Sequence, residues 1–505
     1  MNQINTTNRR DFLRLAGLGA LGAALFPMLG KSEGSTFQSL EKKTPNFVFI
    51  LIDDLGWADV GCDGSKFYET PNIDRLAAGA MRFTDGYAAC PVCSPTRASI
   101  LTGKWPARLH ITDWISGEGN RPSQKLTIPE WQKFLPLTET TIAKALKPAG
   151  YTSAVIGKWR QGGPDYSPLH HGFDVNVAGG DIGHPASYFW PFGAENNHHR
   201  VPGLAERGGK EGDYLTDQLT DEAEKFIAAN KDKPFFLYFA HYAVHTPLMA
   251  KPDKLAKYKA KTPVDEQKNA TYAAMIESMD ESVGRILRQL ETLGLADNTV
   301  VVFTGDNGGL WPQATCNAPL RAGKGYAYEG GTREPFIVKW PGVTKPGATC
   351  AVPVCSIDFF PTLLEIAGVP LPNKVDGVSL VPLLKQSGTL DRVALYWHYP
   401  HYWGGVPPRV RPFGAIRAGD WKLIEFYEDM NVELYNLKDD LGETRDLASS
   451  KPELVSELRA RLHAWRESVG AQMPTPNANY KPLVPGAKKG KRVTDAELRV
   501  MATES

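Results

Sequence analysis

The sequence predicts an α/β protein with a large mixed, mostly parallel sheet and a smaller α+β unit towards the C-terminus. The runs 47–52, 234–240 and 299–304 are almost continuously apolar, which is typical of parallel strands buried on both faces. An amphipathic helical pattern, such as that from Met275 to Leu290, separates strand from strand. The alternating patterns after residue 394 instead predict antiparallel strands.

Length and composition fit a globular chain with one large core and a smaller domain. The chain has 505 residues, of which 22% are charged, and its net charge is +1. This balance gives no general attraction to nucleic acid or to an anionic membrane, so any anion specificity must be local. Six cysteines in so long a chain do not indicate a disulfide framework.

Residues 1–30 have the pattern of an export signal. The pair Arg9-Arg10 precedes a Gly- and Ala-rich apolar stretch from Leu15 to Leu29, and this order resembles a bacterial twin-arginine signal. Such a signal predicts contact with the twin-arginine export machinery and a periplasmic or secreted protein. The stretch is too short and too rich in glycine for a stable membrane anchor. The alternative is a disordered N-terminus with a chance arginine pair, and 31–44 has the composition of a linker.

Acidic and amide side chains follow two of the predicted core strands. Asp53 and Asp54 come directly after the run 47–52, and Asp306 and Asn307 follow the run 299–304. Open α/β sheets place their ligands at this end of the strands. Four oxygen ligands predict a hard divalent cation, with Ca²⁺ favoured and Mg²⁺ possible. One such pair alone would more simply be a turn.

A short helix is predicted from Ser94, as N-cap, to a stop at Gly103. Cys93 precedes the helix N-terminus, where unpaired N–H groups favour an anion, and Arg97 adds a fixed charge one turn later. A cysteine beside an anion site is a candidate nucleophile. The alternative is an inert free thiol.

The pattern Cys93-x-Pro95-x-Arg97, followed by Thr102-Gly103, resembles the signature of the type I sulfatases of the alkaline phosphatase superfamily. The resemblance implies an alkaline-phosphatase-like sandwich. It also implies that a formylglycine-generating enzyme oxidises Cys93 to formylglycine. Residue 93 would then join the metal ligands Asp53, Asp54, Asp306 and Asn307.

Further motifs follow in the order of that family. Lys158 and Lys324 match two sulfate-contacting lysines, and His245 matches the histidine of a His-x-Pro motif that protonates the leaving alcohol. Arg160 stands where the family usually has histidine, and arginine can bind a sulfate oxygen but cannot act as a base. The resemblance thus implies that Arg160 binds substrate, and that the enzyme either turns over more slowly or uses a base at another position. It also implies these catalytic residues: Cys93, Arg97, Lys158, His245 and Lys324.

The implied activity is hydrolysis of the sulfate ester of an alcohol or sugar. Hydrated formylglycine would attack sulfur while the alcohol leaves. One alternative is a phosphoester or phosphonate hydrolase of the same superfamily, because the site would also accept a tetrahedral phosphoryl group. The other is a non-catalytic glycan-binding relative, which only Arg160 suggests.

The expected domain limits are 45–390 for the catalytic domain, 391–474 for the antiparallel-sheet subdomain and 475–505 for a mobile tail. The aromatic and histidine-rich first strand of the subdomain is either a sugar-binding wall that includes His398 and His401, or ordinary sheet packing. A sulfated carbohydrate is the expected substrate. Within the catalytic domain, 161–212 is expected to form a cleft wall or a lid, with His198-His199 in a solvated loop.

Overall fold

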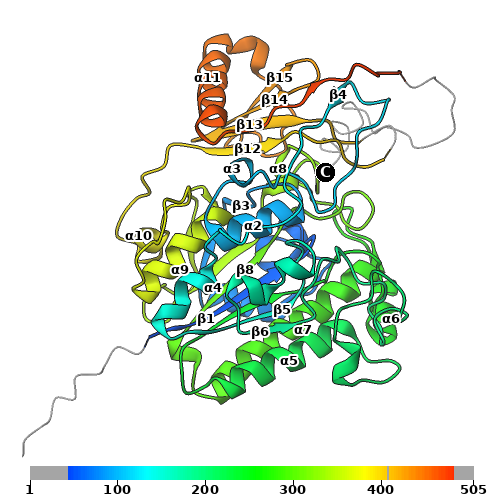
Figure 1. The fold of residues 1–505 in the computed structure, drawn as a ribbon, viewed down its shortest axis with the longest axis vertical. Helices are drawn as coiled ribbons and strands as arrows, with labels where there is room; N and C mark the ends of the chain where they lie inside the picture. The colour runs from blue at the N-terminus through cyan, green and yellow to red at the C-terminus, as the bar shows by residue number, and fades with distance from the viewer. Residues whose placement is uncertain (1–43, 406–408, 483–505) are drawn as a thin grey trace, which may run out of the picture. The chain divides into compact units, whose positions relative to one another are not determined.

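A computed structural model of the protein describes residues 44–405 and 409–482. Its largest element is an eight-stranded mixed sheet with the strand order β10-β2-β9-β8-β1-β7-β5-β6 (Figure 1). Strands β8, β1, β7, β5 and β6 pair in parallel, whereas β9 is antiparallel to both β8 and β2. The mixed, mostly parallel sheet is therefore confirmed. Its strands are β1 (Asn46–Ile52), β2 (Met81–Phe83), β5 (Thr152–Gly157), β6 (Val175–Val177), β7 (Phe235–Ala240), β8 (Thr299–Gly305), β9 (Phe336–Lys339) and β10 (Ala348–Cys350).

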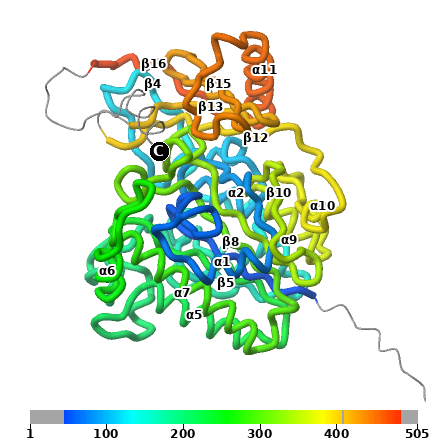
Figure 2. Tube along the Cα trace, turned by 180° about the vertical axis from the view of Figure 1, so that it is seen from behind, coloured from blue at the N-terminus to red at the C-terminus, as the bar shows by residue number. Residues whose placement is uncertain are grey.

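Helices cover both faces of this sheet. Successive side chains of a strand point to opposite faces, and here the side chains on both faces are apolar and must be buried. Val48 and Ile50 of β1 belong to one apolar core, and Phe47 and Phe49 belong to a second one. Figures 1 and 2 show the two helical layers. The first core includes α1 (Pro71–Ala78), α5 (Leu215–Ala229), α6 (Pro252–Lys259) and α7 (Ala270–Thr292); the second includes α2 (Cys93–Thr102), α4 (Ile142–Leu146), α9 (Phe359–Ala367) and α10 (Val381–Leu384).

A four-stranded antiparallel sheet follows in the order β12-β13-β14-β15, as the alternating patterns predict. Its strands are β12 (Leu395–Tyr399), β13 (Phe413–Ala418), β14 (Trp421–Phe426) and β15 (Val432–Asn436), and α11 (Pro452–Ser468) packs on them. This sheet shares one core with residues on both sides of α2, including Tyr87 and Val92 before the helix and Trp105 after it. The C-terminal sheet thus packs against the segments that precede and follow the cysteine helix.

The remaining elements are short connections. They are β3 (Gly86–Tyr87) paired with β11 (Val354–Cys355), β4 (Leu126–Thr127) paired with β16 (Thr475–Pro476), α3 (Pro106–Leu109) and α8 (Glu329–Thr332). The pairing of β16 with β4 places the first residues of the expected mobile tail against the body of the protein. Residues 483–505 of that tail, the export signal 1–30 and the linker up to residue 43 lie outside the described residues.

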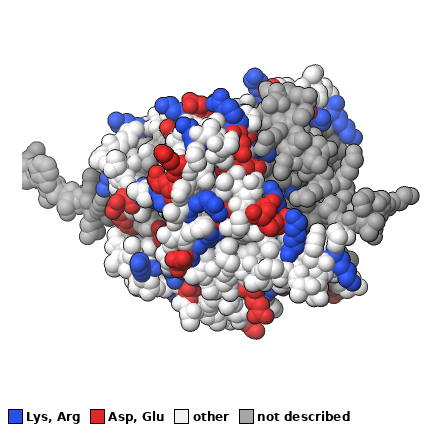
Figure 3. Space-filling model, turned by 90° about the horizontal axis from the view of Figure 1, so that it is seen from above, with Lys and Arg blue, Asp and Glu red and all other residues white. Residues whose placement is uncertain are grey.

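Charged side chains of both signs lie on the surface of the described residues (Figure 3). Figure 3 shows lysine and arginine interspersed with aspartate and glutamate on the face that it draws. Within the described ranges, none of the helices combines the length and the apolar character that crossing a bilayer requires.

Candidate active site

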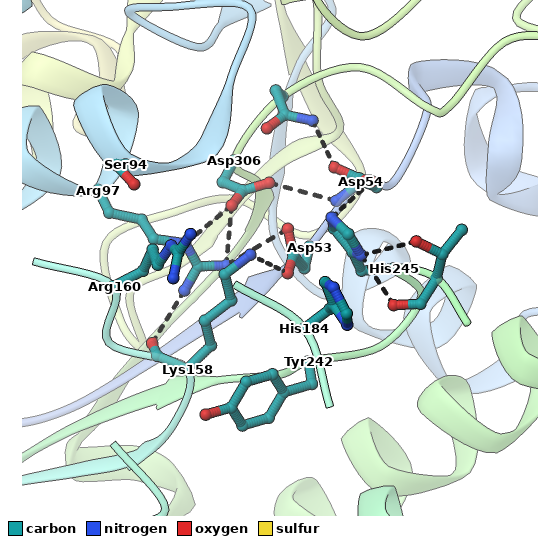
Figure 4. Close-up of polar contacts among 12 residues, drawn as sticks. Asp53, Asp54, Ser94, Arg97, Lys158, Arg160, His184, Tyr242, His245 and Asp306 are labelled. Carbon is teal, nitrogen blue, oxygen red and sulfur yellow. Dashed lines mark hydrogen bonds and ion pairs between the residues drawn. The ribbon is translucent and has the colours of Figure 1, made fainter. Parts of the chain in front are cut away.

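The residues of the site follow the ends of four neighbouring strands of the large sheet. Asp306 follows β8, Asp54 follows β1, His245 follows β7 and Lys158 follows β5, so these side chains gather at one edge of the sheet. Figure 4 shows them converging with side chains from α2. Because these strands are parallel, their carboxyl ends meet at the same edge, where open α/β sheets bind ligands.

Three acid–cation pairs form the floor of the site. Lys158 Nζ lies 2.5 Å from Asp53 Oδ2, and Lys324 Nζ lies 2.5 Å from Asp54 Oδ1. Both Nε and Nη2 of Arg97 lie 2.8 Å from one carboxylate oxygen, Oδ2 of Asp306. All six side chains are buried. Fixed positive charge therefore lies within a site from which water is largely excluded, where it stabilises developing negative charge most strongly.

Three buried oxygens on this floor lack a hydrogen-bond partner among the described residues: Asp53 Oδ1, Asp54 Oδ2 and Asn307 Oδ1. Such acceptors are costly unless a cation or water satisfies them. Asp53, Asp54 and His245 each offer a ligand atom within 4.8 Å of the others'. Oxygen-rich donors of this kind fit a hard divalent cation, so the cluster fits a metal site.

The floor also controls where protons reside. Burial alone would lower the pKa of Lys324, but the adjacent carboxylate of Asp54, together with Cys93 and Asp53, outweighs burial and raises it. In contrast, burial lowers the pKa of His245 to about 4, although Asp54 partly opposes the shift. Nε2 of His245 lies 3.5 Å from Asp54 Oδ2, and its Nδ1 donates to the carbonyl of Thr246 at 2.9 Å. Of the two groups, Lys324 is therefore the one that is positively charged at neutral pH.

Cys93 is the first residue of α2 and lines a cavity above this floor. The preceding Val92 is the N-cap and makes no side-chain capping bond, so the helix N-terminus keeps unpaired N–H groups. The expectation that Ser94 caps the helix is wrong. Ser94 lies inside the first turn, and its Oγ accepts a hydrogen bond from the N–H of Ile115 at 3.1 Å. The extended conformation of Val92 starts the helix earlier than the sequence pattern suggests.

The cavity has a volume of about 640 Å³. Of the residues that the sequence singles out, the structure brings these to its lining: Cys93, Asp54, Arg160, His245, Lys324, His198 and His199. The insertion 161–212 forms part of the wall, as expected for a cleft wall. Sequence reasoning missed Trp114, His184 and Trp403, which also line the cavity. The sequence contains a hint for two of them: His184 lies in the insertion that was expected to form a cleft wall, and Trp403 lies in the aromatic stretch after β12.

Arg160 lies at the cavity wall in a left-handed backbone conformation, with φ of 57°. Its Nη1 donates a hydrogen bond to the backbone carbonyl of Asp181. Burial lowers the pKa of this guanidinium, although the neighbouring Cys93 and Asp181 oppose the shift. The group stays charged because an arginine pKa starts so far above neutrality.

His398 and His401 are the two site candidates that lie neither at the cavity lining nor on the floor of the site. His398 is 4% exposed and contacts Tyr427 Oη at 2.7 Å and the carbonyl of Gln472 at 3.0 Å. His401 is fully buried, with Nε2 2.8 Å from Thr112 Oγ1. Both imidazoles belong to the packing of the C-terminal sheet. Of the two interpretations of the first strand, this geometry favours ordinary sheet packing, because a buried ring cannot reach a sugar.

The family of the chain follows from comparison with known proteins. The family model described as Sulfatase matches residues 45–369, which is more than half of the chain. A second model, N-sulphoglucosamine sulphohydrolase, C-terminal, matches residues 322–468. The chain belongs to the sulfatase family, as its motifs predict.

Individual relatives agree with this assignment over most of the chain. A sulfatase of Formosa agariphila is 33% identical and covers 91% of this chain and 94% of its own length. Human arylsulfatase A is also 33% identical, with 83% and 87% covered. The crystal structure of Ps i-CgsB in complex with k-i-k-neocarrahexaose is 31% identical, has a TM-score of 0.71, and covers 84% of this chain and 93% of that one. The protein is thus a sulfatase, an enzyme that hydrolyses sulfate esters.

Proposed function

We propose that the enzyme cleaves sulfate from a sulfated carbohydrate by using formylglycine derived from Cys93 together with a bound Ca²⁺, for which Mg²⁺ is the alternative. The observation that carries the proposal is the position of Cys93. It begins α2 in a cavity whose floor holds three buried cations and three unpartnered acceptor oxygens. This combination suits a sulfate group, which needs positive charge on several sides and a nucleophile in line with the departing alcohol.

Asp53, Asp54, Asp306 and Asn307 would hold the cation, with residue 93 beside them. When bound, the ion withdraws electron density from the sulfate oxygens, and the hydrated aldehyde supplies a hydroxyl nucleophile. The unpartnered oxygens of Asp53, Asp54 and Asn307 support this ligand set. An all-oxygen set of this kind favours Ca²⁺, which accepts flexible coordination more readily than Mg²⁺ does.

The cations of the chain have separate tasks. Arg97 and Lys158 form ion pairs with the carboxylates of Asp306 and Asp53 and thereby fix the positions of these carboxylates. The same two positive charges would orient the oxygens of the sulfate group. Lys324, which keeps its proton at neutral pH, delivers that proton to the departing alcohol with His245 beside it. Arg160 at the cavity wall would bind a further substrate oxygen.

The size and lining of the cavity support a sugar as the leaving alcohol. About 640 Å³ exceeds what one sulfate group fills and lies in the range of small-molecule sites. Trp114 and Trp403 offer apolar faces, while Ser116 and His199 offer polar groups to hydroxyls. The neocarrahexaose bound to Ps i-CgsB supports the same class of substrate.

Maturation and location complete the proposal. The twin-arginine pattern at Arg9-Arg10 supports export of the folded protein to the periplasm or beyond, where it would take part in glycan degradation. A formylglycine-generating enzyme would act on Cys93 before export.

The test compares an aryl sulfate with the matching aryl phosphate on the metal-loaded enzyme. We expect the higher kcat/KM for the sulfate, and Cys93→Ala should remove turnover of both. Cys316→Ala is the matched control, because this free, half-buried thiol lies outside the cavity lining. A higher kcat/KM for the phosphate, or full activity of Cys93→Ala, would contradict the proposal.

A further inference from the structure

We infer that His184 is the proton acceptor of the cavity and that Arg160 positions it. The inference rests on the proposed function, because it assigns a base to the reaction at residue 93. His184 lies in the insertion between β6 and α5 and lines the same cavity as Cys93. Figure 4 shows its ring beside that of His245.

Hydrogen bonding fixes the tautomer of His184. Its Nδ1 lies 3.1 Å from the carbonyl oxygen of Pro185. Because a carbonyl oxygen only accepts, Nδ1 must carry the proton of this bond, and Nε2 of the neutral ring then holds the lone pair. None of the residues that the structure describes forms a hydrogen bond to Nε2. A fixed imidazole with a free lone pair in a substrate cavity is the arrangement that a general base requires.

Stacking fixes the plane of the same ring. His199 stacks on it with ring centroids 4.1 Å apart, and His245 lies nearly parallel to it at 5.8 Å. The ring of His184 is therefore the middle of three imidazoles. Two stacked neighbours limit its rotation, which a positioned base needs if it is to act repeatedly on one atom.

The other imidazoles of the cavity are less suited to take a proton. His245 directs Nε2 towards Asp54, so its lone pair faces the floor. His198 is exposed, and no carbonyl of the described residues forms a hydrogen bond that would fix its tautomer. His199 has a buried Nδ1 without a partner among the described residues. Burial lowers the pKa of His199, as do its neighbours His184 and His198.

Arg160 cannot replace such a base, but it holds the loop that carries one. Its Nη1 donates to the carbonyl of Asp181. Its guanidinium also packs against Gly183, where a Cβ atom would lie only 3.1 Å from Cζ and Nη2 of Arg160. Both contacts lie on the segment that leads directly into His184, at Asp181 and Gly183. Arg160 is therefore a positioning residue for His184, in addition to any contact with substrate.

The proposed step releases sulfate from residue 93. The carbon–oxygen bond to the sulfate group breaks, and sulfate leaves with the electron pair of that bond. The remaining hydroxyl becomes the aldehyde oxygen, and Nε2 of His184 takes its proton. His184 then returns the proton to solvent, and water hydrates the aldehyde for the next cycle, so no further reactant is needed.

The kinetic test is His184→Gln in the mature, metal-loaded enzyme, with a nitrophenyl sulfate as probe. We expect kcat to fall by about 100-fold or more, while KM rises no more than about threefold. The first turnover should still release one alcohol per site, and mass spectrometry of the quenched protein should find sulfate retained on the peptide that contains residue 93. His170→Gln, an exposed histidine outside the cavity lining, is the matched control.

An unchanged kcat, or a higher KM with no retained sulfate, would overturn the assignment of a base and leave His184 as a substrate contact. The proposed function has its own criterion, because Cys93→Ala must abolish turnover whatever His184 does. A variant that lacks the base but still completes a first turnover can therefore be distinguished from one that lacks the nucleophile and shows no turnover.

A second readout does not depend on activity. In Cys93→Ser protein with ¹⁵N-labelled histidine, nuclear magnetic resonance should show that the neutral ring of His184 carries its proton on Nδ1 and none on Nε2. Gly183→Ala should shift this resonance, since its Cβ would crowd Arg160, whereas Gly163→Ala should not, since nothing lies within 4 Å of a Cβ there. A resonance of the opposite tautomer, or one insensitive to Gly183→Ala, would contradict the positioning by Arg160.

Discussion

The floor and the rim of the active-site cavity differ in how they are held. The floor is made of carboxylates at strand ends and of cations from a strand end, from α2 and from a loop, all of them buried and paired with one another. The rim consists of histidines and tryptophans on loops, which are half-buried or exposed and have few polar partners: Trp114, His184, His198, His199 and Trp403. The comparison teaches that the chemistry of the family is held by the core of the sheet, whereas loops are free to place new groups over it.

The largest effect should come from removing one ligand of the floor. We expect Asp53→Asn to lower kcat/KM by more than about 10³-fold, because it removes a metal ligand and leaves Lys158 without its anionic partner. Calorimetry should show weaker binding of Ca²⁺ to the same variant after chelation. Asp165→Asn, at an exposed site, is the control. Equal Ca²⁺ binding by the Asp53→Asn variant would remove Asp53 from the ligand set.

Lys324→Met tests the proton donor of the floor. We expect a loss of about 10²-fold for a sugar sulfate and a smaller loss for a nitrophenyl sulfate, because nitrophenolate leaves without a proton. Comparing kcat/KM for the two substrates measures this difference, and Lys345→Met at an exposed position is the control. Equal losses on both substrates would show that Lys324 only binds the sulfate group.

A third prediction concerns moving the base of the rim from residue 184 to residue 160. In the His184→Gln background, we expect Arg160→His to raise kcat by about tenfold, because it returns an imidazole to the wall near Cys93. In the otherwise unchanged enzyme the same substitution should not raise kcat, since it also removes the hydrogen bond to Asp181. Steady-state kinetics on all three variants measure this coupling. Independent effects of the two substitutions would argue against a shared role.

The smallest effect concerns the packing behind the rim. Asp113 is buried, and its Oδ1 accepts hydrogen bonds from Tyr399 Oη at 2.8 Å and from the N–H of Trp114 at 2.9 Å. Its Oδ2 lies 3.8 Å from His401 Nδ1 and has no hydrogen-bond partner among the described residues. Burial raises the pKa of Asp113 to about 7.

A raised pKa favours the folded state while the acid is neutral, so this contribution is complete below about pH 4 and is lost as the pH rises through about 7. Asp113→Asn keeps both hydrogen bonds at Oδ1 and stays neutral at every pH. We therefore expect the melting temperature of the variant to exceed that of the parent by about 1–2 °C at pH 8, and by less at pH 5. Thermal melts at both pH values measure this difference, and a variant that is less stable than the parent at pH 8 would contradict it.

The sequence predicted the floor better than the rim for a physical reason. Apolar runs such as 47–52 and 299–304 define β1 and β8, and the residues that follow them must lie at the same edge of a parallel sheet. Nothing local in the sequence ties His184 to Cys93, because their proximity depends on how a long loop folds back. The same limit explains His398 and His401, because the sequence left open whether their strand forms a sugar-binding wall or ordinary sheet packing, and in the structure both rings are buried.

The most direct test of the central claim is the mass of the tryptic peptide that contains residue 93, from protein isolated from its native host. The account predicts formylglycine at position 93, in place of the cysteine that the sequence encodes. Unmodified cysteine in protein that actively hydrolyses sulfate esters would contradict the account, because the nucleophile of the site would then be another group.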